Sequence, residues 1–154
     1  MKYSFVKAVI VIGLVFLFSR IGFSQRCTEP GSIKQITTSS IGKFEYAVFT
    51  FNGSTDDVDY SVETAAPPFT DYSGDEAIRV RGSKFRKIVF KSINWTCRTR
   101  NIARSQSAIK DVKELWTFEG IAEYAVGFRA SSRFISAYHY KSGSFTKVVL
   151  KFRK

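Results

Sequence analysis

The sequence has few of the side chains that small metal sites and disulfide scaffolds need. It contains one histidine and two cysteines in 154 residues. Two cysteines are too few for a disulfide-rich mini-protein or a four-cysteine zinc site. One histidine excludes any centre built on two or three imidazoles. We therefore expect no metal ion and no cofactor.

Sequence motifs of the common enzyme classes are also missing. There is no G-x-S-x-G elbow, no P-loop, no G-x-G-x-x-G after a strand and no H-E-x-x-H. The chain is nevertheless able to build a core, because 44% of its residues are hydrophobic and 16% are aromatic. The sequence predicts a single folded domain without catalytic activity.

The N-terminal segment has the pattern of an export signal. Lys2 and Lys7 precede an uninterrupted apolar run, Ala8 to Phe18. Eleven residues are too short to cross a hydrocarbon core of about 30 Å. Small residues at Gly22 and Ser24 fit cleavage after Ser24. We expect residues 1–24 to be a signal peptide, with a buried core helix or an uncleaved anchor as alternatives, and the mature protein to be periplasmic or extracellular without a transmembrane span.

The two cysteines are the one possible disulfide pair. In an oxidising compartment, Cys27 and Cys97 would close a long loop and contribute about 2–4 kcal/mol. Two separate, inert cysteines are the alternative. No histidine lies near either residue in the sequence, so a nucleophilic role has no support.

Beyond the signal segment, apolar residues recur with period two, which is typical of β-strands. Short strands separated by turn residues predict an all-β fold of about eight antiparallel strands, as a β-sandwich or a closed barrel. The expected strands are 44–52, 57–63, 78–81, 84–91, 112–118, 121–128, 133–140 and 145–152, with a loop over 65–74. We place the domain at 42–154, after an N-terminal extension at 25–41.

Charged residues are segregated along the chain. Eight acidic and no basic residues lie from Glu45 to Glu76, and Ala77 to Lys110 contains no acidic residue. Gly82-Ser83 is expected to be a two-residue hairpin turn. Such a turn would place four cations on one face, and these form our predicted ligand-binding site: Arg79, Arg81, Lys84 and Arg86.

This basic hairpin needs a compensating anion, because like charges opposite each other destabilise a sheet. Without residues 1–24 the chain keeps 21 basic and 13 acidic side chains, a net charge of +8. In an exported protein this charge favours anionic envelope polymers over nucleic acid. Alternatively, the acidic strand Asp57 to Glu63 lies alongside and neutralises the cations internally.

Aromatic residues on the expected strand 133–140 have two interpretations. Tyr138 and Tyr140 share a face with Phe134 by simple alternation. They could form a stacking platform for sugar rings, or they could be ordinary sheet packing. His139 points the opposite way and has no metal-ligand neighbours in the sequence.

The order of these segments resembles the AMIN-like domain of bacterial exported proteins. The similar stretches are 44–53 (FEYAVFTFNG), 60–63 (YSVE), 73–82 with Ser73-Gly74, 118–128 with Phe118-Glu119-Gly120, Arg133-Phe134, and 147–152 (KVVLKF). Tyr46 and Lys151 depart from the family, which often has arginine and aspartate there. The resemblance implies a β-sandwich that attaches to cell-wall material.

Three functions are compatible with these observations. The first is a non-enzymatic module that binds cell-wall glycan, such as peptidoglycan, or another anionic envelope polymer through the basic hairpin. The second is a protein–protein interaction module for an acidic envelope protein. The third is a small hydrolase that uses loop carboxylates, Asp71, Asp75 or Glu76.

Overall fold

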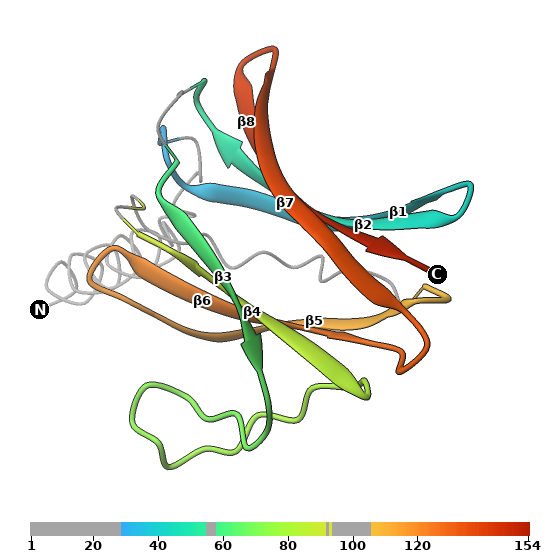
Figure 1. Ribbon diagram of the computed structural model, residues 1–154. Helices are drawn as coiled ribbons and strands as arrows, with labels where there is room; N and C mark the ends of the chain where they lie inside the picture. The colour runs from blue at the N-terminus through green and yellow to red at the C-terminus, as the bar shows by residue number, and fades with distance from the viewer. Residues whose placement is uncertain (1–28, 55–57, 92, 94–105) are drawn as a thin grey trace, which may run out of the picture.

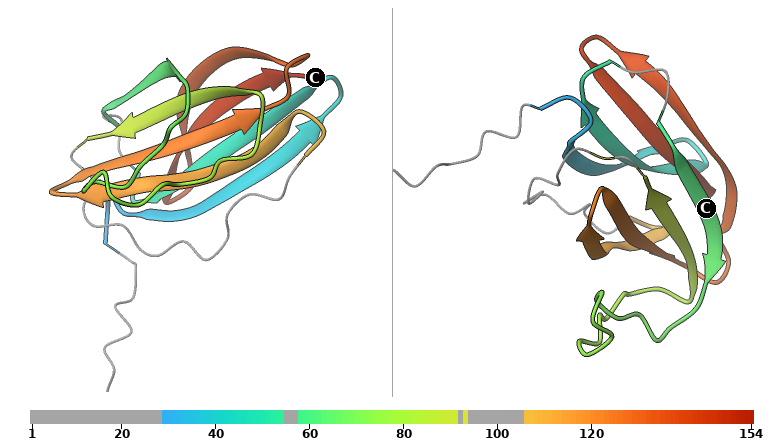
Figure 2. Two further views of the ribbon diagram at one scale, coloured as in Figure 1. Left: turned by 90° about the horizontal axis from the view of Figure 1, so that it is seen from below. Right: turned by 90° about the vertical axis from the view of Figure 1, so that its left-hand side faces the viewer.

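Two antiparallel sheets of four strands face each other in a β-sandwich (Figures 1 and 2). This computed structural model describes residues 29–54, 58–91, 93 and 106–154. Sheet A has the order β1-β2-β8-β7, and sheet B has the order β3-β4-β6-β5. The strands are β1 (Ile33–Ile41), β2 (Phe44–Asn52), β3 (Tyr60–Ala65), β4 (Lys84–Phe90), β5 (Ile109–Phe118), β6 (Ile121–Phe128), β7 (Arg133–Ser142) and β8 (Phe145–Arg153). The prediction of an antiparallel sandwich is confirmed.

Three hairpins organise these strands, and each has a two-residue turn that uses the left-handed region. Gly42 follows β1 with φ +56°, and Gly143 follows β7 with φ +61°. Glu119-Gly120 joins β5 to β6 with φ +46° and +80°, as a tight hairpin turn between twisted strands requires. The predicted strands β2, β6 and β8 agree with the structure to within a residue at each end.

Strand β1 lies inside the segment 25–41, which the sequence led us to treat as an extension. Ile33 and Ile36 are fully buried, and β1 pairs along its length with β2. Between them the register shifts at Ile33/Gln35, so the apolar side chains do not alternate simply. The many Ser and Thr residues of β1 also hide its apolar face from a periodicity analysis.

The predicted Gly82-Ser83 hairpin is wrong. Strand β4 pairs with β3 on one edge and with β6 on the other, so no edge remains for a strand at 78–81. Ser83 donates its N–H to the Phe128 carbonyl at 2.9 Å, at the start of the β4–β6 ladder. Gly82 is required for a close approach instead, because a Cβ there would lie 2.7 Å from the Phe128 nitrogen.

An aromatic cluster fills the space between the sheets. Phe49 of sheet A contacts Phe90 and Tyr124 of sheet B edge-to-face, with ring centroids 5.0 and 5.2 Å apart. Phe51 contacts Phe90 in the same way at 5.0 Å. Burying each such side chain contributes about 1.5–3 kcal/mol. This cluster holds the two sheets together.

A buried carboxylate adds a polar link between the sheets. Glu45 of β2 is fully buried. Its Oε2 accepts the backbone N–H groups of Ala108 and Ile109, each at 2.8 Å, and its Oε1 accepts the Ser107 hydroxyl. Glu45 therefore ties sheet A to the beginning of β5 in sheet B.

The segment between β3 and β4 folds over the outer face of sheet B (Figure 1). Phe69 is buried there against Leu115 and Ala125, and Val80 packs on the same small cluster. The sheet approaches this segment closely at Gly127, where a Cβ would lie 2.0 Å from the Arg81 carbonyl oxygen. Sheet B therefore has a second, smaller apolar layer on its outer side.

Several expectations fall on residues outside the described ranges. These are the signal segment 1–24 and both cysteines, Cys27 and Cys97. Among the described residues, no helix is long and apolar enough to span a membrane.

Candidate functional site

Charge is distributed unequally between the two sheets. The strands of sheet A carry six cationic side chains and one carboxylate, Glu45, which is buried. The cations are Lys34, Arg133, Lys141, Lys147, Lys151 and Arg153. The strands of sheet B carry five cations and four carboxylates, so they are nearly balanced. The excess positive charge of the strands is therefore a property of sheet A.

The outer face of sheet A combines these cations with tyrosines. We call this surface the tyrosine–lysine face, and it consists of Tyr46, Tyr138, Tyr140, Lys147 and Lys151. Their positions follow from strand register, since Tyr140 pairs with Lys147, and Lys151 pairs with Tyr46. Paired residues of antiparallel strands point to the same side. No carboxylate lies on this side of the four described strands.

Two of the tyrosine rings on this face are exposed to solvent and stack on each other. Tyr138 and Tyr140 stack with centroids 6.3 Å apart at 25°, and the two residues are 41% and 44% exposed. Partial burial raises the pKa of Tyr138, and the neighbouring hydroxyls of Tyr46 and Tyr140 add to this effect. The rings thus form a stacked pair on edge strand β7, with a third tyrosine two strands away.

Cation–π contacts position the lysines of this face and its margin. The Lys151 ammonium lies 4.0 Å from the Phe44 ring centroid, and Lys147 lies 6.0 Å from that of Tyr140. At the margin, Lys34 lies 4.1 Å from the Phe145 centroid. Such contacts are worth about 0.5–1 kcal/mol at exposed sites. They keep the positive charges beside aromatic surface and leave the ammonium groups available to an anion.

The expected grouping of Phe134 with these tyrosines is wrong. Strand β7 has a register shift between Phe134 and Ser136. The extra residue reverses the alternation, so Phe134 packs inward against Phe152 with centroids 5.5 Å apart. His139 points to the inner side, as expected, and contacts the Tyr60 ring edge-to-face at 5.9 Å.

The four predicted binding cations do not form one face. Arg79 and Arg81 lie exposed in the segment that covers sheet B, and Arg81 is 3.6 Å from the Asp111 carboxylate. Lys84 begins β4. The Arg86 guanidinium donates to the Thr64 hydroxyl and lies 4.7 Å from the Phe134 ring centroid.

The alternative of internal neutralisation placed the acidic strand beside the four predicted cations. The ion pair that this strand makes is with Lys87 of β4, which is not one of the four. Strand β3 pairs with β4, as the acidic strand would have to. The Lys87 ammonium lies 2.8 Å from Glu63 and 3.4 Å from Glu123. The hydrogen bond that the Lys87 ammonium donates to Glu63 raises the pKa of Lys87, and Glu123 contributes in the same direction.

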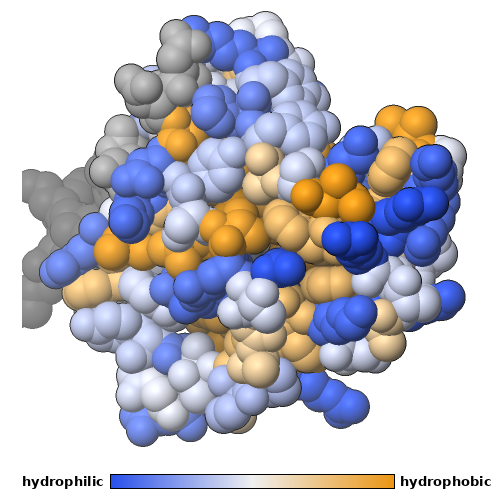
Figure 3. Space-filling view, in the orientation of Figure 1, coloured by the Kyte–Doolittle hydropathy of each residue, from blue (hydrophilic) through white to orange (hydrophobic). Residues whose placement is uncertain are grey.

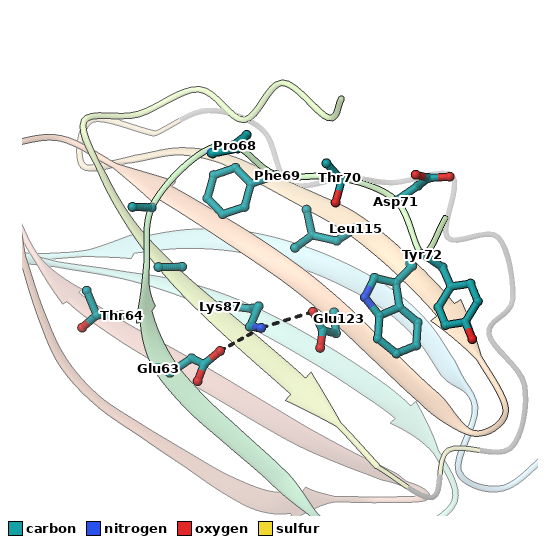
Figure 4. Close-up of a pocket in the computed structure, with 13 residues that line it drawn as sticks. Glu63, Thr64, Pro68, Phe69, Thr70, Asp71, Tyr72, Lys87, Leu115 and Glu123 are labelled. Carbon is teal, nitrogen blue, oxygen red and sulfur yellow. Dashed lines mark ion pairs between the residues drawn. The ribbon is translucent and has the colours of Figure 1, made fainter. Parts of the chain in front are cut away.

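A pocket of about 440 Å³ opens on the outer face of sheet B, beneath the loop that follows β3 (Figure 4). The Lys87 ion pairs lie at its base, between β3, β4 and β6. Aromatic and apolar side chains form part of its walls, among them Phe69, Tyr72, Leu115 and Trp116. We call it the acid–aromatic pocket.

Among the loop carboxylates proposed for a hydrolase, that of Asp71 has structural partners. Asp71 accepts the Ser73 hydroxyl at 2.8 Å and the Glu76 N–H at 3.1 Å, and these bonds lower its pKa. Asp71 therefore holds the turn of its own loop. Asp75 and Glu76 do not line the acid–aromatic pocket. The described residues hold no cluster of three His, Cys, Asp or Glu side chains suited to a metal ion.

Comparison with protein-family models and with curated proteins gives no match. The resemblance to AMIN-like domains thus stays a prediction.

The sequence indicated Tyr138 and Tyr140 as a candidate stacking platform but not the whole tyrosine–lysine face, because Tyr46 lies on β2, far from β7 and β8 in the sequence. The sequence shows two alternating runs, Lys147-Val149-Lys151 and Tyr138-Tyr140, each with its members on one face of a strand. It does not show the pairing of β2 with β8, which brings Tyr46 beside Lys151.

Proposed function

We propose that this chain is an exported, non-enzymatic module that binds an anionic cell-envelope polymer containing sugar rings, such as peptidoglycan, through the tyrosine–lysine face. The observation that carries the proposal is the composition of this face: exposed stacked tyrosines beside lysines, with no carboxylate on the same side of the described strands. This site replaces the basic hairpin, which does not form.

The chemistry of the face matches such a polymer in two ways. Lysine ammonium groups attract carboxylates or phosphates along a chain, and this attraction is screened by salt. Tyrosine rings offer apolar faces for stacking together with a hydroxyl that can form hydrogen bonds. The stacked pair Tyr138 and Tyr140 lies on an edge strand, where an extended ligand has access along the sheet.

The test is co-sedimentation of the purified protein with isolated peptidoglycan sacculi at low and high salt. Retention at high salt is expected, because stacking on tyrosine rings is not screened. Complete release at high salt would leave only the generic attraction of a basic protein and would favour an acidic protein partner instead.

Matched charge variants locate the site. Replacing Lys147 and Lys151 with Gln removes two charges from the tyrosine–lysine face and should weaken retention. Replacing Arg79 and Lys84 with Gln removes two exposed charges from the predicted basic hairpin and should change retention much less. Equal losses from both pairs would mean that net charge, and not this face, causes binding.

A further inference from the structure

The acid–aromatic pocket lies on the opposite sheet from the tyrosine–lysine face and has the opposite charge. Three carboxylates line it, those of Glu63, Asp71 and Glu123, against one ammonium, that of Lys87. The pocket is therefore net negative within a chain whose formal net charge is +11. Glu63 keeps 57% of its side-chain surface exposed while it pairs with Lys87, so it retains acceptor capacity toward the solvent side of the pocket.

Aromatic rings form the wall beside these carboxylates. The Tyr72 and Trp116 centroids are 5.4 Å apart with the planes at 58°, so the two rings form a corner. Phe118 stacks on Tyr72 at 4.9 Å and 29°, which supports the exposed Tyr72 ring from outside the pocket. Ring faces attract cations through their quadrupole, and tryptophan is the strongest of the aromatic side chains in this respect.

We propose that the acid–aromatic pocket binds an organic cation, an alkylammonium or guanidinium group about the size of a lysine or arginine side chain. The volume of about 440 Å³ lies within the range for ligand pockets and leaves room for a group of this size. The carboxylates supply charge-assisted acceptors, and Trp116 and Tyr72 supply the aromatic faces.

Lys87 shows that this site stabilises positive charge. Its ammonium lies between Glu63 and Glu123, and Figure 4 shows both ion pairs. One intrinsic cation neutralises only one of the three lining carboxylates. It also fixes the two glutamates across β3, β4 and β6, so their remaining oxygens are held in place for a ligand.

The probe for this proposal is n-butylammonium, with n-butanol and butyrate as neutral and anionic probes of similar shape. Binding is followed by ¹H–¹⁵N chemical shifts, including the Trp116 indole N–H. Saturable shifts around the pocket are expected with butylammonium, much weaker ones with butanol and none with butyrate. If butanol binds as tightly as butylammonium, the pocket is apolar rather than cation-selective; if butylammonium causes no saturable shift, the proposal is wrong.

Variants separate the pocket from general electrostatics. Glu63→Gln and Glu123→Gln each leave Lys87 with one carboxylate partner and should weaken butylammonium binding about tenfold. Asp75→Asn removes one charge from the same loop without touching the pocket, and its effect should stay within about twofold. Equal weakening by all three variants would overturn the proposal. An unchanged spectrum away from the pocket checks that each variant is folded.

Discussion

Glu45 provides the sharpest test of how the two sheets are joined. Glu45→Ala removes the acceptor of two backbone N–H groups, those of Ala108 and Ile109, and both residues are buried. A buried donor left without a partner costs about 1–3 kcal/mol. The two donors together predict a loss of about 2–6 kcal/mol in the free energy of unfolding.

Glu45→Gln is the matched control. A glutamine carbonyl in the place of Oε2 keeps both backbone hydrogen bonds, and its amide faces the Ser107 hydroxyl, which can rotate and accept. This variant loses only the negative charge that strengthens the hydrogen bonds, so we expect the free energy of unfolding to fall by about 1–2 kcal/mol.

Urea unfolding measures both variants. With a slope of about 2 kcal/mol per molar, the midpoint should fall by about 2 M for the alanine variant and by less than about 1 M for the glutamine variant. Equal midpoints for the two variants would refute the argument that unsatisfied donors dominate. A loss below about 1 kcal/mol for alanine would also refute it.

The pH dependence gives a second check on Glu45. Burial alone would raise the pKa of Glu45, but hydrogen bonds from Ser107, Ile109 and Ala108, together with Lys154, outweigh it and lower the pKa below the ordinary 4.5. Stability from a lowered pKa is complete above the ordinary value and is lost as pH falls through the folded-state pKa. The difference between wild type and Glu45→Gln should therefore shrink as pH falls below 4.5.

Two further substitutions test the packing of sheet B. Gly127→Ala would place its Cβ 2.0 Å from the Arg81 carbonyl oxygen and should lower the free energy of unfolding in urea by about 3 kcal/mol or more. Gly143→Ala is the control: its Cβ meets open space at φ +61°, so the loss should be only about 1 kcal/mol. Equal losses for the two variants would contradict the close approach at Gly127. Tyr124→Phe removes a buried hydroxyl that lies 3.1 Å from the Glu114 carboxylate and should cost about 1 kcal/mol. No change in the midpoint for this variant would show that the hydrogen bond contributes nothing.

Local signals in the sequence were sufficient for most of the fold. Aromatic and β-branched residues predicted β2, and alternation predicted β8. Glu119-Gly120 marked a hairpin that depends on only two neighbouring strands. β1 was missed because its bulge and its Ser and Thr residues obscure the apolar face. Gly82 was taken for a turn residue, although a glycine is needed at this position because the backbone lies directly against β6.

The candidate sites depend on information that is not local. Both require strands to pair out of sequence order, β2 with β8 and β4 with β6. The acid–aromatic pocket also requires the loop after β3 to fold over sheet B. Figure 3 shows apolar side chains exposed in a band across one view of the molecule, bordered by hydrophilic residues. Hydrophobic patterning along the chain could not predict which apolar groups would stay at the surface.

The most direct test of the proposed function is ¹H–¹⁵N chemical-shift mapping with soluble peptidoglycan fragments. We expect the largest changes on β7 and β8, around Tyr138, Tyr140 and Lys147, and their persistence at high salt. Changes centred on Arg79 and Lys84 instead, or no changes in sheet A, would contradict binding through the tyrosine–lysine face.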